Sequence, residues 1–238
     1  MSYLNTKPLI YGFEQGMMKE EIELLTDFPA SIADMLIKDE VDISLVPVAI
    51  IPQLDEYHII TDYCIGADGA VASVCLFSDV PLAEIKTILL DYQSRSSVAL
   101  LRIILRDLWN IDPELTAAGP DYEEKIGGNT AGLVIGDRAF IQRKKRKYIY
   151  DLGSAWKELT GLPFVFAAWV ANKKLPPDFI DRFNNAVAEG FKHLPGIIAA
   201  NPYTHYDLEE YYTKNISFDL TAEKRRGLEE FLKRIPNS

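Results

Sequence analysis

Helical segments and buried strands alternate along this chain, and that alternation constrains the fold more than any other feature. A helix is expected over residues 29–38, where Ser31 and Asp34 resemble a capping box. Residues 41–48 follow as a buried strand, and residues 49–54 as another helix. A helix, strand, helix order of this kind predicts an α/β protein.

The alternation continues beyond this first unit. Further strands are expected at residues 59–65, 70–77, 87–91, 130–135 and 148–152, and a longer apolar strand ends near Trp169. From Pro176 onward the pattern becomes helical, with Phe179, Phe183, Val187 and Phe191 on one stripe that we expect to pack in a core. Thr221 is expected to cap a last helix.

Composition excludes several classes of function. The net charge of −10 over 238 residues disfavours binding to nucleic acid or to anionic membrane surfaces, and the basic run at residues 143–147 is expected to be a solvated face. Cys64, Cys75 and the three histidines show no metal-ligand spacing, so we expect no metal and no cofactor. No signal sequence is visible, which favours a reduced, cytoplasmic protein.

The first eight residues form a polar turn that leads directly into a helix. Within it, Asn5 carries an amide that can donate and accept beside the free N–H groups of a first helical turn, which suits an oxygen-rich anion. Asn5, Thr6 and Pro8 are also common at helix starts. From these residues alone, a helix cap is the favoured interpretation of Asn5.

Serines and an arginine gather where a strand meets a helix, at Ser94, Arg95, Ser96 and Ser97. Hydroxyls, free N–H groups and a guanidinium together suit a carboxylate, and a single serine is enough for a cap. Ser73, in an apolar strand, is either a core hydroxyl bonded to nearby backbone or a group that faces a ligand. Asp137, which follows a strand, is most simply the cap of the next helix.

Several of these segments, in this order, resemble one family. The segments are residues 2–9 (SYLNTKPL), 42–48 (DISLVPV), 94–98 (SRSSV), 135–137 (IGD), and 150–153 with 156–169 (YDLG and the stretch that ends in FVFAAW). With them the chain resembles the chorismate dehydratases of the futalosine route to menaquinone over nearly its whole length.

The resemblance implies a two-lobed fold like that of the type 2 periplasmic binding proteins, an α/β fold with a ligand cleft between the lobes. Two strand crossings would act as hinges, near residues 71–77 and 164–169. Lobe one would comprise residues 1–75 and 168–238, and lobe two residues 76–167. Relatives usually carry a short apolar strand before the SYLN motif, so lobe one is expected to lack an edge or a central strand. Either the true start lies upstream, or the cleft is held less firmly than in relatives.

The resemblance also implies loss of water from chorismate to give 3-[(1-carboxyvinyl)oxy]benzoate. It places Asn5 and Ser73 as catalytic residues in the cleft. The expected substrate-binding residues are Tyr3, Leu4, Val46, Pro47, Ser94, Arg95, Ser96, Ser97, Asp137 and Phe164. Since no histidine or lysine is placed to titrate near neutrality, our hypothesis is that a substrate carboxylate takes the ring proton, with Asp137 as the rival base.

Two other functions fit the same pattern. One is a non-catalytic cytoplasmic binding protein for a small carboxylate, because a fold does not establish chemistry. The other is the sibling enzyme 1,4-dihydroxy-6-naphthoate synthase, which shares the fold but has a different opening motif. In each case the expected partner is a small molecule, and the sequence leaves the oligomeric state open.

Overall fold

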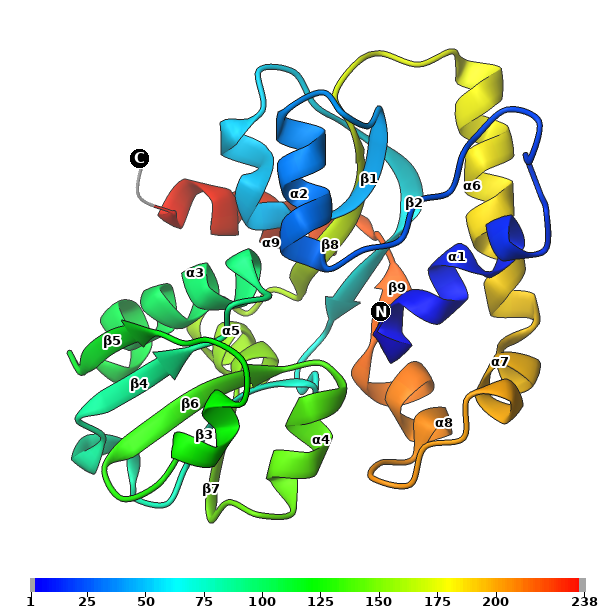
Figure 1. Ribbon diagram of the computed structural model, residues 1–238. Helices are drawn as coiled ribbons and strands as arrows, with labels where there is room; N and C mark the ends of the chain where they lie inside the picture. Colours follow the sequence, from blue (N-terminus) through cyan, green and yellow to red (C-terminus); the bar gives the residue numbers. More distant parts are fainter. Residues whose placement is uncertain (1–2, 236–238) are drawn as a thin grey trace.

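Two β-sheets organise the computed structural model, which describes residues 3–235 (Figure 1). The first sheet has four strands in the order β1 (Ile43–Pro47), β8 (Phe164–Ala171), β2 (His58–Ala67) and β9 (Ser217–Asp219). All of its neighbouring strands are antiparallel. The first sheet therefore joins segments from the beginning, the middle and the end of the chain.

The second sheet is built from the middle of the chain. Its order is β5 (Glu114–Ala117), β4 (Thr87–Leu90), β6 (Thr130–Ile135), β3 (Val74–Ser78) and β7 (Tyr148–Asp151). β4 runs parallel to β5 and β6, whereas β3 runs antiparallel to β6 and β7. The mixed α/β architecture with two sheets confirms the predicted fold class.

Helices cover both sheets. Those beside the first sheet are α1 (Lys7–Glu14), α2 (Pro29–Ile37), the short helix η2 (Val48–Gln53), α6 (Pro177–Lys192), α7 (Leu194–Ala200) and α9 (Ala222–Arg234). Those beside the second sheet are α3 (Arg95–Ile104), its continuation η4 (Leu105–Trp109), α4 (Asp137–Arg143) and α5 (Leu152–Thr160). The Thr221 side chain accepts a hydrogen bond from the Lys224 amide, so the predicted cap of the last helix is confirmed.

The chain passes between the sheets twice, from Ala67 to Val74 and from Asp151 through α5 to Phe164 (Figure 1). We had expected the second passage at residues 164–169. These residues belong to β8, which lies wholly within the first sheet, so the passage comes earlier in the chain. This sheet membership supports a proposed division into two lobes at these two passages.

Two local predictions were wrong. Ser31 and Asp34 form no capping box, because the Ser31 hydroxyl donates to the Asp27 carboxylate (2.7 Å) and Asp34 pairs with Arg95. In the basic run, the three lysines are exposed as expected, but Arg146 is only partly exposed and donates to the Ile126 carbonyl oxygen (2.6 Å). A main-chain carbonyl without a strand partner needs a hydrogen-bond donor, and a long arginine side chain can supply one while its stem is partly buried.

The first sheet has an open side at β1. Among the described residues, no strand pairs with its outer edge, and the facing extended segment, residues 23–27, makes no backbone-to-backbone hydrogen bond. A cavity of about 590 Å³ separates the two, and the buried indole N–H of Trp169, which lines it, has no partner among the described residues. Within residues 3–235, the outer edge of β1 is therefore not covered by a strand.

None of the helices within residues 3–235 has the length and apolar character that crossing a membrane requires.

Candidate functional site

A second, smaller cavity of about 80 Å³ lies where the two sheets meet. Its walls come from the chain's start, the ends of β1, β3 and β6, the loop before α3, and the middle of β8. The polar side chains around it belong to Tyr3, Asn5, Thr6, Ser73, Gln93, Ser94 and Ser97. Because residues from both sheets contribute, the two passages between the sheets decide the shape of this site.

Six of the twelve predicted site residues line this cavity: Tyr3, Asn5, Pro47, Ser73, Ser94 and Ser97. The other six, Leu4, Val46, Arg95, Ser96, Asp137 and Phe164, are not among its lining residues. The structure thus brings together residues that are far apart in the sequence, and it places several of their neighbours elsewhere.

Asn5 lies in a single helical turn, Leu4–Thr6, just before α1. Neither this turn nor α1 has a side-chain cap, so the cap interpretation of Asn5 was wrong. Its Oδ1 accepts a hydrogen bond from the Thr6 hydroxyl (3.3 Å), and the side chain borders the cavity. Asn5 therefore keeps its amide nitrogen available as a donor inside the site.

Ser73 does not continue a strand but follows a tight turn. The preceding residue, Ala72, has a positive φ of 61°, a conformation that costs a non-glycine residue about 1 kcal/mol or more. Residues 70–73 therefore lie outside β3, although we had expected a strand from residue 70. The Ser73 side chain is fully buried and borders the cavity.

The hydroxyl of Ser73 meets a residue that the sequence patterns did not single out. Tyr211 donates a hydrogen bond of 2.8 Å to Ser73 Oγ, and both side chains are fully buried. Neither interpretation of Ser73 from the sequence anticipated a tyrosine partner. Burial raises the pKa of Tyr211 well above its ordinary value, so the phenol stays protonated.

The serine-rich loop caps α3 and faces the cavity at the same time. Ser94 Oγ accepts from the Ser97 amide (3.1 Å), and its hydroxyl donates to Ser97 Oγ (2.8 Å). Both serines line the cavity. The N-terminus of α3, with its free N–H groups, therefore lies at this wall of the site.

Arg95 and Ser96 form the first turn of α3, next to Ser94, but serve other contacts. Arg95 forms an ion pair of 2.5 Å with Asp34 on α2. Ser96 is buried, and its Oγ accepts a hydrogen bond from the Ala49 amide (3.1 Å). Both contacts join the start of α3 to the helices beside the first sheet.

Leu4, Val46 and Phe164 are buried behind the cavity wall. Phe164 packs edge-on against Trp156 and Phe231, and Phe166, one strand period further on, borders the cavity in its place. These three residues support the site through packing.

Asp137 stands at the start of α4, where Gly136 occupies the cap position. Its carboxylate accepts a hydrogen bond from the Leu4 amide (3.2 Å) instead of capping its own helix. Burial raises the pKa of Asp137 to about 6, and the Leu4 hydrogen bond offsets part of that effect. Asp137 thus ties the chain's start to the second sheet.

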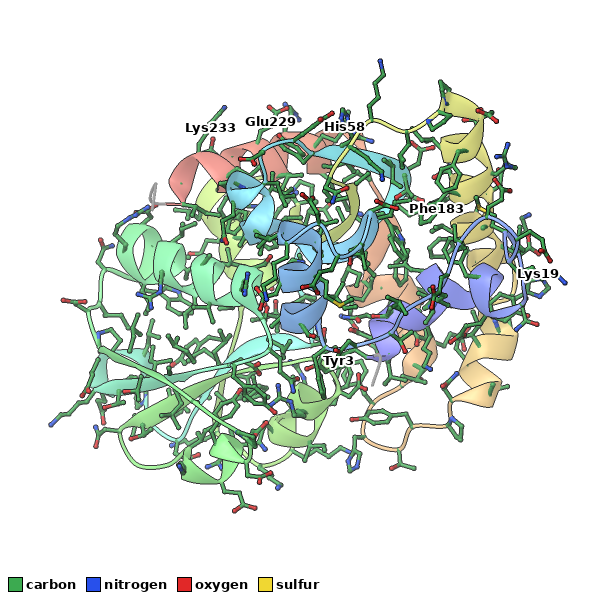
Figure 2. All side chains as sticks on the ribbon, turned by 45° about the horizontal axis from the view of Figure 1, so that its top comes forward. Tyr3, Lys19, His58, Phe183, Glu229 and Lys233 are labelled. Atoms are coloured by element: carbon green, nitrogen blue, oxygen red, sulfur yellow. The ribbon has the colours of Figure 1, made fainter. Side chains whose placement is uncertain are left out.

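Tyr3 packs its ring against Gly136, where an added Cβ would lie 2.5 Å from the ring carbons. Its hydroxyl donates to Gln93 Oε1, which also accepts from Arg138 (3.2 Å). Figure 2 places Tyr3 where the N-terminal helices meet the green segments of the second sheet. Burial raises the pKa of Tyr3 to about 12, so its hydroxyl remains a donor.

Behind Gln93 lies a buried ion pair. Arg138 donates to Asp91 (2.6 Å), whose side chain is fully buried and whose carboxylate also accepts from the Tyr122 hydroxyl (2.8 Å). Burial raises the pKa of Asp91, and the charge of Arg138 opposes that shift. This network holds Gln93, and through it Tyr3, in one position.

Thr6, Gln93 and Tyr211 are polar residues at the site that the sequence interpretation did not assign to it. Gln93 directly precedes the serine loop, so its position next to Ser94 was a signal for it. Tyr211 had no local signal, because it reaches Ser73 across 138 residues of sequence.

Comparisons with known proteins agree on a family. The sequence profile of a family described as menaquinone biosynthesis matches residues 1–237. A chorismate dehydratase of Thermus thermophilus is 28% identical over 258 aligned residues, which cover 96% of this chain and 91% of that protein.

Solved structures show the fold. A protein of Archaeoglobus fulgidus superposes with a TM-score of 0.74 at 14% identity, covering 98% of this chain and 93% of that one. The alkanesulfonate-binding protein SsuA of Xanthomonas axonopodis pv. citri gives 0.64 at 9% identity, with 98% and 92% covered. A Candida albicans protein described as having the generic periplasmic binding protein fold gives 0.61 at 15%, with 97% and 86% covered. The chain therefore has the periplasmic-binding-protein-like fold that we expected.

Proposed function

This chain belongs to the menaquinone biosynthesis family, and we propose that it removes water from chorismate to form 3-[(1-carboxyvinyl)oxy]benzoate. The observation that carries the proposal is the meeting of Asn5 and Ser73 at one small cavity between the sheets. Ser73 is buried and Asn5 is half-buried, and both side chains offer hydrogen-bond donors to an anion.

In the proposed reaction, a hydrogen leaves one ring carbon as a proton and the neighbouring hydroxyl leaves as water. The ring diene becomes aromatic, and this supplies the driving force. The protein's task is to orient the substrate, provide a base and assist the departing hydroxyl.

We propose that the base is the carboxylate on the substrate's own enolpyruvyl arm. The polar side chains described around the cavity are amides, hydroxyls and one phenol, none of which is a good base near neutral pH. Asn5 and Ser73 would hold the arm so that its carboxylate reaches the ring proton. The base then comes with the substrate, and these two side chains set its direction.

A second carboxylate, on the ring, would bind at the loop before α3. Ser94 and Ser97 line the cavity there, and the helix N-terminus favours negative charge. Because Arg95 is paired with Asp34 outside the lining, we assign this contact to the serines and the helix end.

Substrate entry requires the lobes to move apart. A cavity of about 80 Å³ is far below the roughly 300–1,000 Å³ of typical ligand pockets. Rotation about the two passages between the sheets would open the site, and closure would then expel water and strengthen each hydrogen bond. The tight cavity supports a closed form of such a cycle.

Asp137 remains the rival base, since its raised pKa of about 6 would allow it to accept a proton. Its carboxylate, however, faces the Leu4 amide and does not line the cavity. We therefore expect Asp137→Asn to keep at least a third of wild-type kcat at pH 7.5. A well-folded variant that binds chorismate and has lost all turnover would move the base to Asp137.

The first test is incubation of the protein with chorismate and detection of the aromatic product by its absorbance and mass. Product formation that depends on enzyme concentration supports the proposal. Binding of chorismate without turnover, measured by calorimetry, would instead identify a carboxylate-binding protein. If chorismate neither binds to the protein nor is converted, the assignment of the site is rejected.

The second test removes one polar group at a time. Asn5→Ala and Ser73→Ala should each lower kcat by roughly 100-fold or more, as deletion of a catalytic hydrogen-bond donor does. Ser78→Ala is the matched control, because Ser78 is an equally buried serine that bonds to the Val80 carbonyl oxygen away from the cavity. Full turnover in both site variants would contradict the assignment.

We also propose that the reaction takes place in the cytoplasm, with chorismate as the small-molecule partner.

A further inference from the structure

Tyr211 is a buried titratable group for which the proposed reaction has no role so far. It begins a short π-helical turn, Tyr211–Asn215, a form of helix that is rare and frequent at functional sites. It does not line the cavity, yet its hydroxyl lies 2.8 Å from Ser73 Oγ, which does. A contact between a buried phenol and a site hydroxyl calls for an explanation.

The Tyr211 ring is fixed from several sides. Phe140 meets it edge-on at 4.9 Å between ring centroids, and Tyr206 and Tyr212 pack at 6.4 Å and 5.5 Å. Phe140 in turn stacks on Tyr206. With the ring held by these neighbours, the phenol oxygen has one position relative to Ser73.

The directions of the hydrogen bonds around Tyr211 follow from their partners. Asn5 Oδ1 accepts from Thr6, which leaves the Asn5 amide nitrogen as the group that would donate towards the Tyr211 oxygen. Asn5 lies close enough to oppose, weakly, the effect of burial on the pKa of Tyr211. Tyr211 then donates to Ser73 Oγ. Among the residues that the structure describes, the Ser73 hydroxyl has no other partner, and its own hydrogen is left to point into the cavity.

We propose that Tyr211 is the positioning residue that links Asn5 to Ser73 and makes the Ser73 hydroxyl a hydrogen-bond donor towards the substrate. The inference rests on the proposed function, because it names how that site is held. Burial raises the pKa of Tyr211 and so keeps the phenol protonated across the ordinary pH range. The direction of the proposed relay, from Asn5 through Tyr211 to Ser73, therefore stays constant.

The test compares wild type, Tyr211→Phe, Ser73→Ala and the double variant. Tyr211→Phe should lower kcat by about 10-fold or more with less than a threefold change in KM. In the Ser73→Ala background, the same change should lower kcat by less than about twofold, because Tyr211 acts through Ser73. An equal loss in both backgrounds, or full activity of Tyr211→Phe, would overturn the proposal.

Tyr206→Phe is the control, since Tyr206 belongs to the same aromatic cluster but bonds to Asn215 and does not touch Ser73. It should keep wild-type kcat within about twofold. If wild type itself shows no turnover, the proposed function fails, and thermal unfolding of the same four proteins tests the relay. The double variant should then lower Tm no more than the larger single change, and additive losses would contradict a shared hydrogen bond.

Discussion

The carboxylate of Asp151 accepts a hydrogen bond of 2.8 Å from the backbone amide of Ala72, the residue whose left-handed conformation turns the chain into Ser73. The same carboxylate accepts from the Val71 amide (3.1 Å) and from two amides at the start of α5. One side chain thus caps a helix and holds the turn that presents Ser73. The stability of α5 and the geometry of the site are thereby coupled.

Asp151→Ala should therefore damage both stability and turnover. Loss of a cap that also accepts hydrogen bonds from the Val71 and Ala72 amides is expected to lower the free energy of unfolding by about 2–4 kcal/mol. Because the turn before Ser73 loses its support, kcat should fall by roughly 10-fold or more. Urea unfolding and a steady-state assay measure the two effects.

Asp207→Ala is the matched control for that change. Asp207 caps the short helix α8 (Leu208–Glu210) by accepting a single hydrogen bond from the Glu210 amide, and its carboxylate does not bond to the amides of residues 71 and 72. It should lower stability by about 1 kcal/mol and leave kcat within about twofold. Equal effects of the two substitutions on kcat would argue against a special role for Asp151.

Much of this architecture was predictable from local patterns. The helices at Pro29–Ile37 and Ala222–Arg234 and most strands follow from apolar spacing and turn residues, because those signals act over a few neighbouring residues. The start of β3 was predicted four residues too early, because residues 70–73 are apolar enough for a strand. The turn is explained by the distant Asp151 carboxylate, which accepts hydrogen bonds from the Val71 and Ala72 amides.

The site was less predictable, for the same reason. Asn5 and Ser73 stood out through the resemblance, but Tyr211, the hydrogen-bond partner of Ser73, lies 138 residues from it. Arg95 looked like a carboxylate ligand by composition, yet Asp34, 61 residues away, draws its side chain aside. Contacts of this kind depend on the assembled topology, and no local pattern encodes them.

Gly136 should tolerate no side chain. Its φ is 61°, and an added Cβ would lie 2.5 Å from the Tyr3 ring, so Gly136→Ala combines backbone strain with a displaced Tyr3. We expect a loss of about 2–4 kcal/mol in the free energy of unfolding and a clear rise in KM. Gly161→Ala has a comparable φ of 72° but open space around it, and should cost only about 1 kcal/mol without kinetic effect.

Asp137 should make the protein less stable as the pH rises. Its pKa of about 6 in the folded state lies above the ordinary 3.8, so the folded protein binds this proton more tightly than the unfolded chain. The resulting stability is complete below about pH 4 and is lost as the pH rises through 6. In Asp137→Asn this dependence disappears. The free energy of unfolding of the variant, relative to that of wild type, should therefore increase by about 1–3 kcal/mol from pH 4 to pH 7. Parallel curves from urea titrations would contradict the prediction.

An extended apolar segment added ahead of Ser2 should fill the gap beside β1 and stabilise the protein. Tyr3 and Thr6 line that gap, β1 and residues 23–27 offer unpaired backbone groups, and Leu24, Leu25 and Phe28 expose apolar side chains nearby. A seven-residue extension rich in valine and isoleucine should raise Tm by about 5–10 °C and slow amide hydrogen exchange in β1. A glycine and serine extension of equal length is the control. Equal Tm values for the two extended proteins would show that the gap does not accept a strand.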